Sequence, residues 1–213
     1  MMRRRSVIAV ATALLVGVVA RRSLARSKQV AADAVIDDAV FWSIVEGTLI
    51  HEANTDDQSE ALFVALSALS TDQVVAFTDA FARQMLKACT WDLWAVDYIA
   101  HGGASDDGFE YFRRWLISKG RQAFERVLAQ PDDLASILAP DSRGVLEYEE
   151  FATVAWDVWA EKTGKSPEDI PMTADTMAAM DAEPRGEPFA EDPAALAARF
   201  PKTWARFGQH PLT

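Results

Sequence analysis

Two adjacent aspartates, Asp106 and Asp107, are the residues whose type and spacing could most directly perform chemistry. With His101 before them and Glu110 after them, they could bind a metal ion or act as an acid–base pair. The spacing matches no established metal-ligand pattern, because the histidine and the acids would have to converge across a turn. Asp107 followed three residues later by Glu110 also fits a helix capping box. We expect this cap, no metal site and no catalytic residue, although one carboxylate could still face a cleft.

Arginines follow the aspartates on the same predicted helix. Arg113 and Arg114 stand three and four residues after Glu110, the spacing of ion pairs along one helix face. An arginine held in this way and packed against an aromatic ring could instead position an anionic ligand. Our candidate binding residues are therefore Asp106, Asp107, Arg113, Arg121 and Trp94.

Most tryptophans of the chain lie at helical spacings and could be pictured as a stacking surface for sugars or bases. They are Trp42, Trp91, Trp94, Trp115, Trp156 and Trp159. At such spacings tryptophans more often pack in the core, where each indole N–H finds an acceptor. We expect core packing for the set and keep Trp94 among the candidate binding residues.

Other motifs for catalysis or cofactor binding fail on inspection. Cys89 is the only cysteine, so no intramolecular disulfide is possible, and its apolar neighbours predict a buried, inert thiol. A stretch around Gly144 resembles a calcium loop, but the alignment puts Ala139 at the first ligand position. The histidines suggest no catalytic triad, and no glycine-rich phosphate loop occurs. We expect no cofactor.

Charge is distributed unevenly along the 213 residues, whose net charge is -11. Residues 1–30 contain seven Lys or Arg and no acid. The remaining residues therefore hold 14 of the 21 basic residues against 32 acidic ones, a net charge of -18. A body this acidic repels phosphate backbones and argues against nucleic acid as a partner. A protein partner, a small ligand or a cation remains open.

Residues 1–30 are typical of a targeting segment. A basic start precedes the uncharged apolar run of residues 6–20, and arginines follow it. As a helix this run would span roughly 22 Å, less than the roughly 30 Å of a bilayer core. Three interpretations remain: a short membrane anchor, a cleaved signal, or a start placed too far upstream. We favour the anchor, which would make the protein membrane-associated; a misplaced start would make it cytoplasmic.

The remaining elements that must position these candidates are helical throughout. Apolar residues recur with helical period over residues 38–50, 56–69, 70–100, 107–130 and 147–162, and no stretch alternates long enough for a strand. Gly102-Gly103 is predicted to end one long helix before the next begins. The fold class is therefore all-α, a compact multi-helix domain with two long helices joined at a Gly-Gly turn.

The composition divides the chain into an N-terminal segment of residues 1–30, a helical core of residues 38–164 and an acidic, proline-rich arm of residues 165–213. The arm is predicted to be mostly loop, with a weak turn at residues 174–180. Asp192-Pro193 opens a short helix, and Trp204 with Phe207 should dock it back on the core.

The order of several short motifs resembles an uncharacterised bacterial family known as domain of unknown function 4240. The motifs are Phe41-Trp42, Leu93-Trp94, Ser105-Asp106-Asp107-Gly108-Phe109, Phe112-Arg113, Trp115-Leu116-Ile117, Gly120-Arg121, Pro131-Asp132-Asp133-Leu134 and Phe200-Pro201-Lys202-Thr203-Trp204 with Arg206-Phe207. The resemblance covers roughly residues 38–208, and its tail is similar to that of many actinobacterial members. It implies a small helical domain inside the cell with no established activity, in a family sometimes fused to regulatory and protein-interaction modules.

Two functional hypotheses follow from these features. The first is a helical protein-interaction or ligand-binding domain of regulatory type, tethered to a membrane, with its contact surface near residues 102–113. The second is a metal-dependent or anion-binding hydrolase that uses Asp106, Asp107 and Arg113.

Overall fold

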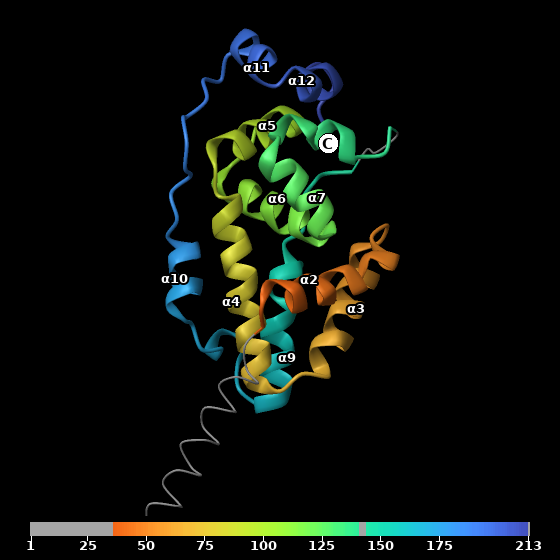
Figure 1. The fold of residues 1–213 in the computed structure, drawn as a ribbon, viewed down its shortest axis with the longest axis vertical. Helices are drawn as coiled ribbons and strands as arrows, with labels where there is room; N and C mark the ends of the chain where they lie inside the picture. Colours follow the sequence, from red (N-terminus) through yellow and green to blue (C-terminus); the bar gives the residue numbers. More distant parts are fainter. Residues whose placement is uncertain (1–35, 141–143, 213) are drawn as a thin grey trace, which may run out of the picture. The chain divides into compact units, whose positions relative to one another are not determined.

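Helices account for the regular structure of residues 36–140 and 144–212, the part of the chain that the computed structural model describes (Figure 1). No sheet forms within these residues, where a single isolated bridge pairs Thr90 with Arg185. The all-α prediction is confirmed. The α-helices are α2 (Asp38–Gly47), α3 (Thr55–Ser67), α4 (Thr71–Ala88), α5 (Trp91–His101), α6 (Asp106–Ser118), α7 (Gly120–Ala129), α8 (Leu134–Ile137), α9 (Val154–Thr163), α10 (Ala174–Met180), α11 (Pro193–Arg199) and α12 (Pro201–Phe207).

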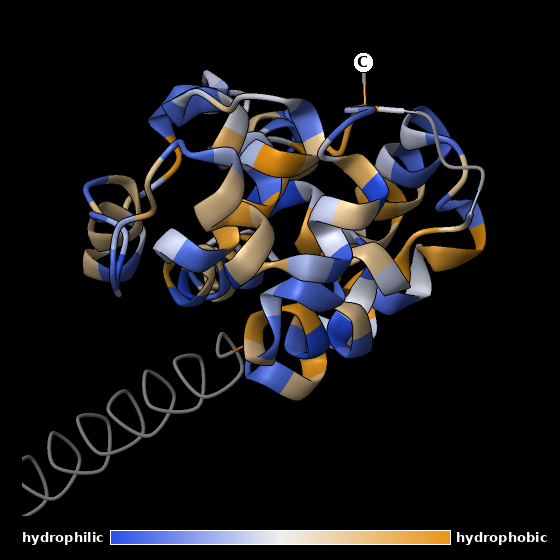
Figure 2. Ribbon diagram, turned by 90° about the horizontal axis from the view of Figure 1, so that it is seen from above, coloured by the Kyte–Doolittle hydropathy of each residue, from blue (hydrophilic) through white to orange (hydrophobic). Residues whose placement is uncertain are grey.

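Helix α4 is the centre of the core, with α2, α6, α9 and α10 packed around it. Its start is fixed by a capping box, in which Ser70 and Gln73 exchange side-chain and backbone hydrogen bonds. Of the apolar residues predicted to form its inner stripe, Val74, Phe77, Phe81 and Met85 are buried and Leu86 is half-buried. Phe77 packs against Phe41 of α2 with ring centroids 5.1 Å apart. In Figure 2 the helices carry hydrophobic and hydrophilic residues side by side, as expected when each buries only one face.

Several predicted helices are shorter in the structure than the periodicity suggested. The segment of residues 70–100 is divided at Cys89 into α4 and α5, because Thr90 caps a new helix by accepting from the Leu93 amide at 3.3 Å. The prediction of one continuous helix over residues 107–130 was also wrong. This segment is divided into α6 and α7, and Gly120, at the start of α7, has a φ of 82°. The two long helices are therefore four shorter ones.

The ends of two other predicted helices also differ. Helix α2 stops at Gly47, and a 3-10 turn at Leu49–His51 leaves Ile50 exposed instead of on the inner stripe. The last helix of the predicted core begins at Val154 and not at Glu147, after a separate 3-10 turn at Glu150–Ala152.

Gly102 ends α5 in the left-handed conformation, with a φ of 69° and a ψ of 24°. The Gly103 amide donates to the Tyr98 carbonyl at 2.9 Å, which satisfies an acceptor at the helix end. The C-terminal residues cover this turn: the Leu212 amide donates to the Ala100 carbonyl at 2.8 Å, and a Cβ on Gly102 would lie 2.9 Å from Cγ of Pro211. The turn is thus both a helix end and a docking point for the tail.

We expect Gly102→Ala to lower the free energy of unfolding by about 1–3 kcal/mol. About 1–2 kcal/mol reflects the left-handed conformation, and the displaced Pro211 ring adds to it. Urea unfolding followed by circular dichroism measures the change. Gly47→Ala is the matched control, because Gly47 lies in α2 with no atom near its added Cβ, and it should raise stability by up to about 1 kcal/mol. Equal effects at both glycines would contradict this account.

The C-terminal segment packs on the preceding helices, so that residues 36–213 form one compact unit. The turn predicted at residues 174–180 is helix α10, which lies along α4, while α12 lies against α5 and the turn Pro131–Asp133 (Figure 1). Phe200 and Phe207 are buried at this second contact.

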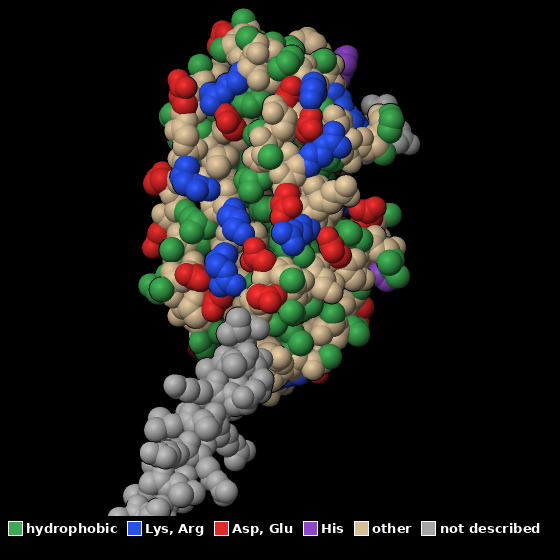
Figure 3. All heavy atoms as spheres, in the orientation of Figure 1, with side chains coloured by type: hydrophobic (Ala, Val, Ile, Leu, Met, Phe, Trp, Pro, Cys, Tyr) green, Lys and Arg blue, Asp and Glu red, His purple; other side chains and the backbone are tan. Residues whose placement is uncertain are grey.

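Charges of both signs are interleaved on the face of the molecule that Figure 3 shows. Figure 3 shows Lys and Arg side chains between Asp and Glu side chains over one face, so the excess negative charge forms no continuous acidic patch there.

The predicted anchor of residues 6–20, with the rest of residues 1–30, lies outside the described residues. Within residues 36–140 and 144–212, no helix combines the length and the apolar character needed to cross a membrane.

Candidate functional site

Two adjoining pockets lie between the helical core and the C-terminal segment. The first has a volume of about 200 Å³ and is lined mainly by α4, α6, α9 and α10. The second has a volume of about 530 Å³ and is lined by the first halves of α5 and α6 and by residues 180–184. Glu110, Arg113 and Met180 belong to both, so these side chains form the shared wall.

The second pocket brings together Trp94, Asp106, Asp107 and Arg113, four of the five residues proposed from the sequence. The fifth, Arg121, borders neither pocket. It lies exposed on α7, where its Nε donates to Glu125 at 2.7 Å. The break at Gly120 separates Arg121 from the face of α6 that carries Arg113.

Asp106 and Asp107 lie exposed in the first turn of α6, but neither is its N-cap. The predicted cap by Asp107 was wrong, because the Ser105 hydroxyl accepts from the Gly108 amide at 3.1 Å and caps the helix instead. The two carboxylates still suit the positive end of the helix dipole. No cluster of three or more His, Cys, Asp or Glu side chains in the described ranges is placed to hold a metal ion.

Glu110 and Arg114, four residues apart on α6, form the predicted ion pair. The second guanidinium nitrogen of Arg114 donates to the Glu149 carbonyl. Glu110 is therefore neutralised by Arg114 and not by Arg113. The guanidinium of Arg113 does not have Glu110 as an ion-pair partner.

Arg113 is 8% exposed and carries its charge into the core. Its Nε donates to the Phe109 carbonyl at 3.4 Å and one Nη donates to the Met85 carbonyl at 3.2 Å. No carboxylate of the described chain lies within ion-pair distance of it. Burial lowers the pKa of Arg113, although an arginine remains charged at neutral pH. A buried cation without an anionic partner thus faces both pockets.

Aromatic rings support this guanidinium from one side. Trp91 and Trp94 stack with centroids 5.2 Å apart, Trp94 stacks on Phe109 at 5.0 Å, and Arg113 lies 4.8 Å over the Phe109 ring. The Trp94 indole donates to the Ala104 carbonyl at 3.4 Å. Trp94 therefore packs against protein rings, as expected for most of the tryptophans, and shapes the wall behind Arg113.

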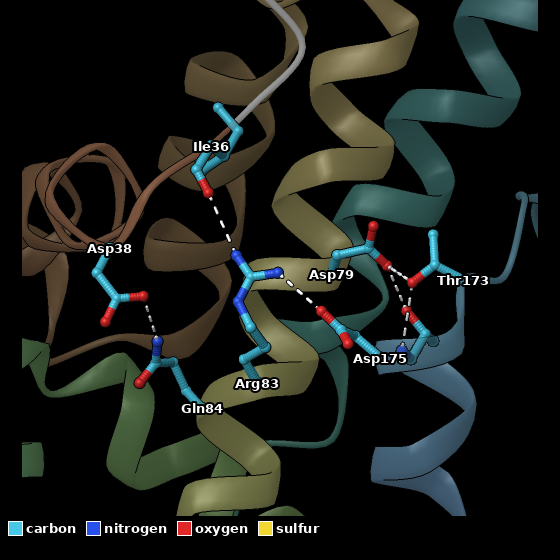
Figure 4. A network of polar contacts seen from close by, with 8 residues as sticks. Ile36, Asp38, Asp79, Arg83, Gln84, Thr173 and Asp175 are labelled. Carbon is cyan, nitrogen blue, oxygen red and sulfur yellow. Dashed lines mark hydrogen bonds and ion pairs between the residues drawn. The ribbon is translucent and has the colours of Figure 1, made fainter. Parts of the chain in front are cut away.

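Residues 173–185 form a strap over the pockets, and polar contacts hold its two ends. At one end, shown in Figure 4, Asp79 of α4 accepts hydrogen bonds from the hydroxyls of Thr173 and Thr176, the latter at 2.8 Å. Arg83 pairs with Asp175 at 3.1 Å in the same view. Thr176 is the one buried residue of α10, so the helix has few apolar contacts. It is held in place mainly by these polar contacts.

Arg185 fixes the other end of the strap. Its amide donates to the Cys89 carbonyl at 3.0 Å, and its guanidinium donates to the Lys87 carbonyl at 2.8 Å at the end of α4. The intervening Met180–Pro184 stretch is thereby held against the second pocket.

The family model described as "Protein of unknown function (DUF4240)" matches residues 36–161. The chain belongs to the DUF4240 family. No curated protein and no solved structure matches it. The matched region contains the motifs from Phe41-Trp42 to Pro131-Asp132-Asp133-Leu134 that carried the resemblance, while the similar tail at residues 200–207 lies beyond it.

This DUF4240 domain also holds a buried pair that the sequence analysis did not identify, Asp97 and His101 of α5. The imidazole Nε2 accepts from the Leu146 amide at 2.9 Å, so its proton lies on Nδ1, which donates to Asp97 at 2.7 Å. Neither residue borders the two pockets. With Nε2 already occupied, the pair joins α5 to the segment before α9 and does not resemble an acid–base site.

Burial and the contact between the two side chains together set the pKa values of this pair. It raises the pKa of Asp97 to about 6, against the hydrogen bond and charge of His101, which lower it. Burial also disfavours the charged imidazolium, but Asp97 outweighs it and raises the pKa of His101. The Leu146 amide opposes protonation of Nε2, because a protonated nitrogen cannot accept its hydrogen bond.

Sequence reasoning missed Cys89, Trp91 and residues 180–184 as parts of the second pocket, and it missed the first pocket entirely. Cys89 was predicted to be buried and is, with its thiol donating to the Ala182 carbonyl at 3.4 Å and its pKa raised by burial. Residues 180–184 have no apolar periodicity, so no local signal marked them as a pocket wall.

Proposed function

We propose that this DUF4240 domain is a binding domain of regulatory type that captures a small ligand through one anionic group at Arg113. The observation that carries the proposal is the buried guanidinium of Arg113, which borders two pockets and has no carboxylate partner within the described residues. A charge removed from water is costly unless an opposite charge and hydrogen bonds compensate it. A carboxylate in the first pocket would supply both.

The charges around each pocket support binding on the side of the first pocket. Of its lining residues, Glu110 and Arg114 neutralise one another, so Arg113 leaves one net positive charge. The second pocket has five carboxylates against the same guanidinium, and its Asp106 and Asp107 would repel a multiply charged anion. The arrangement therefore suits a ligand with a single negative charge.

The test measures the binding of sodium benzoate and of its uncharged isostere benzamide by titration monitored with NMR. We expect benzoate to bind, benzamide to bind at least about tenfold more weakly, and Arg113→Gln to remove the difference between them. The matched control is Arg121→Gln, which removes an exposed arginine outside both pockets and should leave both affinities unchanged. Arg113→Lys, which keeps the charge but not the planar donors, should bind benzoate at an intermediate strength.

Circular dichroism first establishes that each variant is folded. Equal benzoate affinity in folded wild-type and Arg113→Gln proteins would overturn the proposal, as would the absence of any benzoate binding by the wild type.

Hydrolysis at the same place is the second candidate, because Asp106 and Asp107 line one pocket with Arg113. A hydrolase of this kind would use the carboxylates to hold a divalent cation and the arginine to bind an anionic substrate. Melting temperature with and without Mg²⁺, Mn²⁺ and Zn²⁺ tests this idea in wild type and in Asp106→Asn/Asp107→Asn. A rise in the wild type alone would favour the hydrolase over the binding domain.

A further inference from the structure

The lining of the first pocket indicates a second chemical property of the ligand that Arg113 binds. This inference rests on the proposed function. We infer that the ligand is a monocarboxylate with a compact apolar body, such as an aryl or short alkyl acid, and that the body occupies the first pocket beneath α10. Arg113 would then bind the carboxylate at the wall shared by the two pockets.

The lining of the first pocket is mainly apolar, with two threonines, Thr78 and Thr176, and one charged side. Its apolar wall includes Phe77, Phe81 and Met85 of α4 and Ala155 and Trp156 of α9. The charged residues, Glu110, Arg113 and Arg114, all come from α6. Charge at one side and a mainly apolar wall elsewhere match a ligand that has its polar group at one end.

The volume limits the apolar body. An engineered apolar cavity of about 150 Å³ holds one benzene ring. At about 200 Å³, the first pocket has room for one ring and a short linker, or for a short alkyl chain. Longer chains would have to extend into the acidic second pocket, past Met180.

Helix α10 provides access to this pocket. Ala179 and Met180 line it from above, and Met180 is 67% exposed, so the pocket lies directly under the surface. The contacts of Asp79 and Arg83 that hold α10 are polar and near its start, whereas Ala179 near its end is only partly buried against the core. A ligand can therefore enter by a local displacement of α10.

The experiment fills the pocket from α10 and leaves Arg113 unchanged. Ala179→Leu places a larger side chain against the first pocket, whereas Ala178→Leu adds the same side chain at the adjacent, exposed position of the same helix. The probes are phenylacetate, which has an apolar body, and acetate, which has none. We expect Ala179→Leu to weaken phenylacetate binding at least about tenfold and acetate binding less than about twofold, and Ala178→Leu to change neither.

Comparison with Arg113→Gln separates failure of this inference from failure of the proposed function. If Arg113→Gln weakens both probes but Ala179→Leu leaves phenylacetate binding intact, the carboxylate is bound at Arg113 and the apolar body lies elsewhere, which overturns the inference alone. If Ala179→Leu blocks phenylacetate but Arg113→Gln does not weaken it, the proposed function fails. Preference of the wild type for acetate over phenylacetate would also overturn the inference.

Discussion

Replacement of His101 by alanine is expected to lower the free energy of unfolding by about 3–5 kcal/mol at pH 8. Asp97 is 1% exposed and its Oδ1 depends on the imidazole, while its Oδ2 has no hydrogen-bond partner within the described residues. Loss of the imidazole leaves a buried carboxylate without compensation, which typically costs this much. The Leu146 amide loses its acceptor in the same step.

This penalty should shrink as the pH falls. In the wild type burial already raises the pKa of Asp97 to about 6, and the groups that lower it belong to His101. Without His101 the pKa of Asp97 must rise further, and protonation then removes the buried charge. Because a raised pKa in the folded state favours folding at low pH, the variant should lose stability as the pH rises from 5 to 8. The wild type also loses stability over this range through the raised pKa of His101, and the variant should be the steeper of the two because no imidazole stabilises its ionised Asp97.

Urea unfolding at pH 5 and pH 8, followed by circular dichroism, measures both effects. The double variant Asp97→Asn/His101→Ala is the control, since it has no charge to bury. It should be more stable than His101→Ala at pH 8 and differ little from it at pH 5. A penalty independent of pH in the single variant would mean that lost packing, and not the charge of Asp97, causes it.

The second large effect is expected at Asp132, whose replacement by alanine should cost about 3 kcal/mol. Helix α12 begins with Pro201, and the preceding residue, Phe200, has no side chain that could cap it. The buried Asp132 carboxylate caps it instead, with one oxygen accepting from the Lys202 amide at 3.0 Å and the other from the Thr203 amide at 2.8 Å. Hydrogen bonds to a charged group contribute about 1.5–3 kcal/mol each, and their loss would leave two amides unpaired.

The neighbouring Asp133 is a matched control for this prediction. It forms ion pairs with Arg126 at 2.9 Å and Lys202 at 2.6 Å, and these partners lower its pKa. Both ion pairs lie at the surface, so Asp133→Ala should cost less than about 1 kcal/mol. Hydrogen exchange by mass spectrometry should show faster exchange over residues 200–207 in Asp132→Ala but not in Asp133→Ala. Equal protection in both variants would show that α12 does not depend on the Asp132 cap.

Local chemistry explains which parts of this fold were predictable. The start of α4 after Ser70, the left-handed Gly102 and the Glu110–Arg114 ion pair each involve residues within a few positions of one another. The apolar period likewise identified the buried stripe of α4. Such features could be read from the sequence because one helical turn determines them.

Features that depend on distant contacts could not be read in this way. The contact of Asp132 with α12 joins two motifs of the family resemblance, yet some 70 residues separate them. Arg113 and Arg121 looked equivalent on one continuous helix, and only the positive φ of Gly120 separates them. The walls that Met180 and its neighbours add to the pockets depend on contacts of Arg185 with the end of α4.

Because residues 173–185 are attached by polar contacts, the stability of this domain and the chemistry of its pockets depend on different residues. Most of the buried core lies in helices outside the strap, since the strap buries little and is fixed by a few contacts at Asp79 and Arg185. The size and chemistry of the enclosed space depend on what lies between those contacts. Exchange of that short stretch alone would change the selectivity of the domain while its scaffold stayed intact.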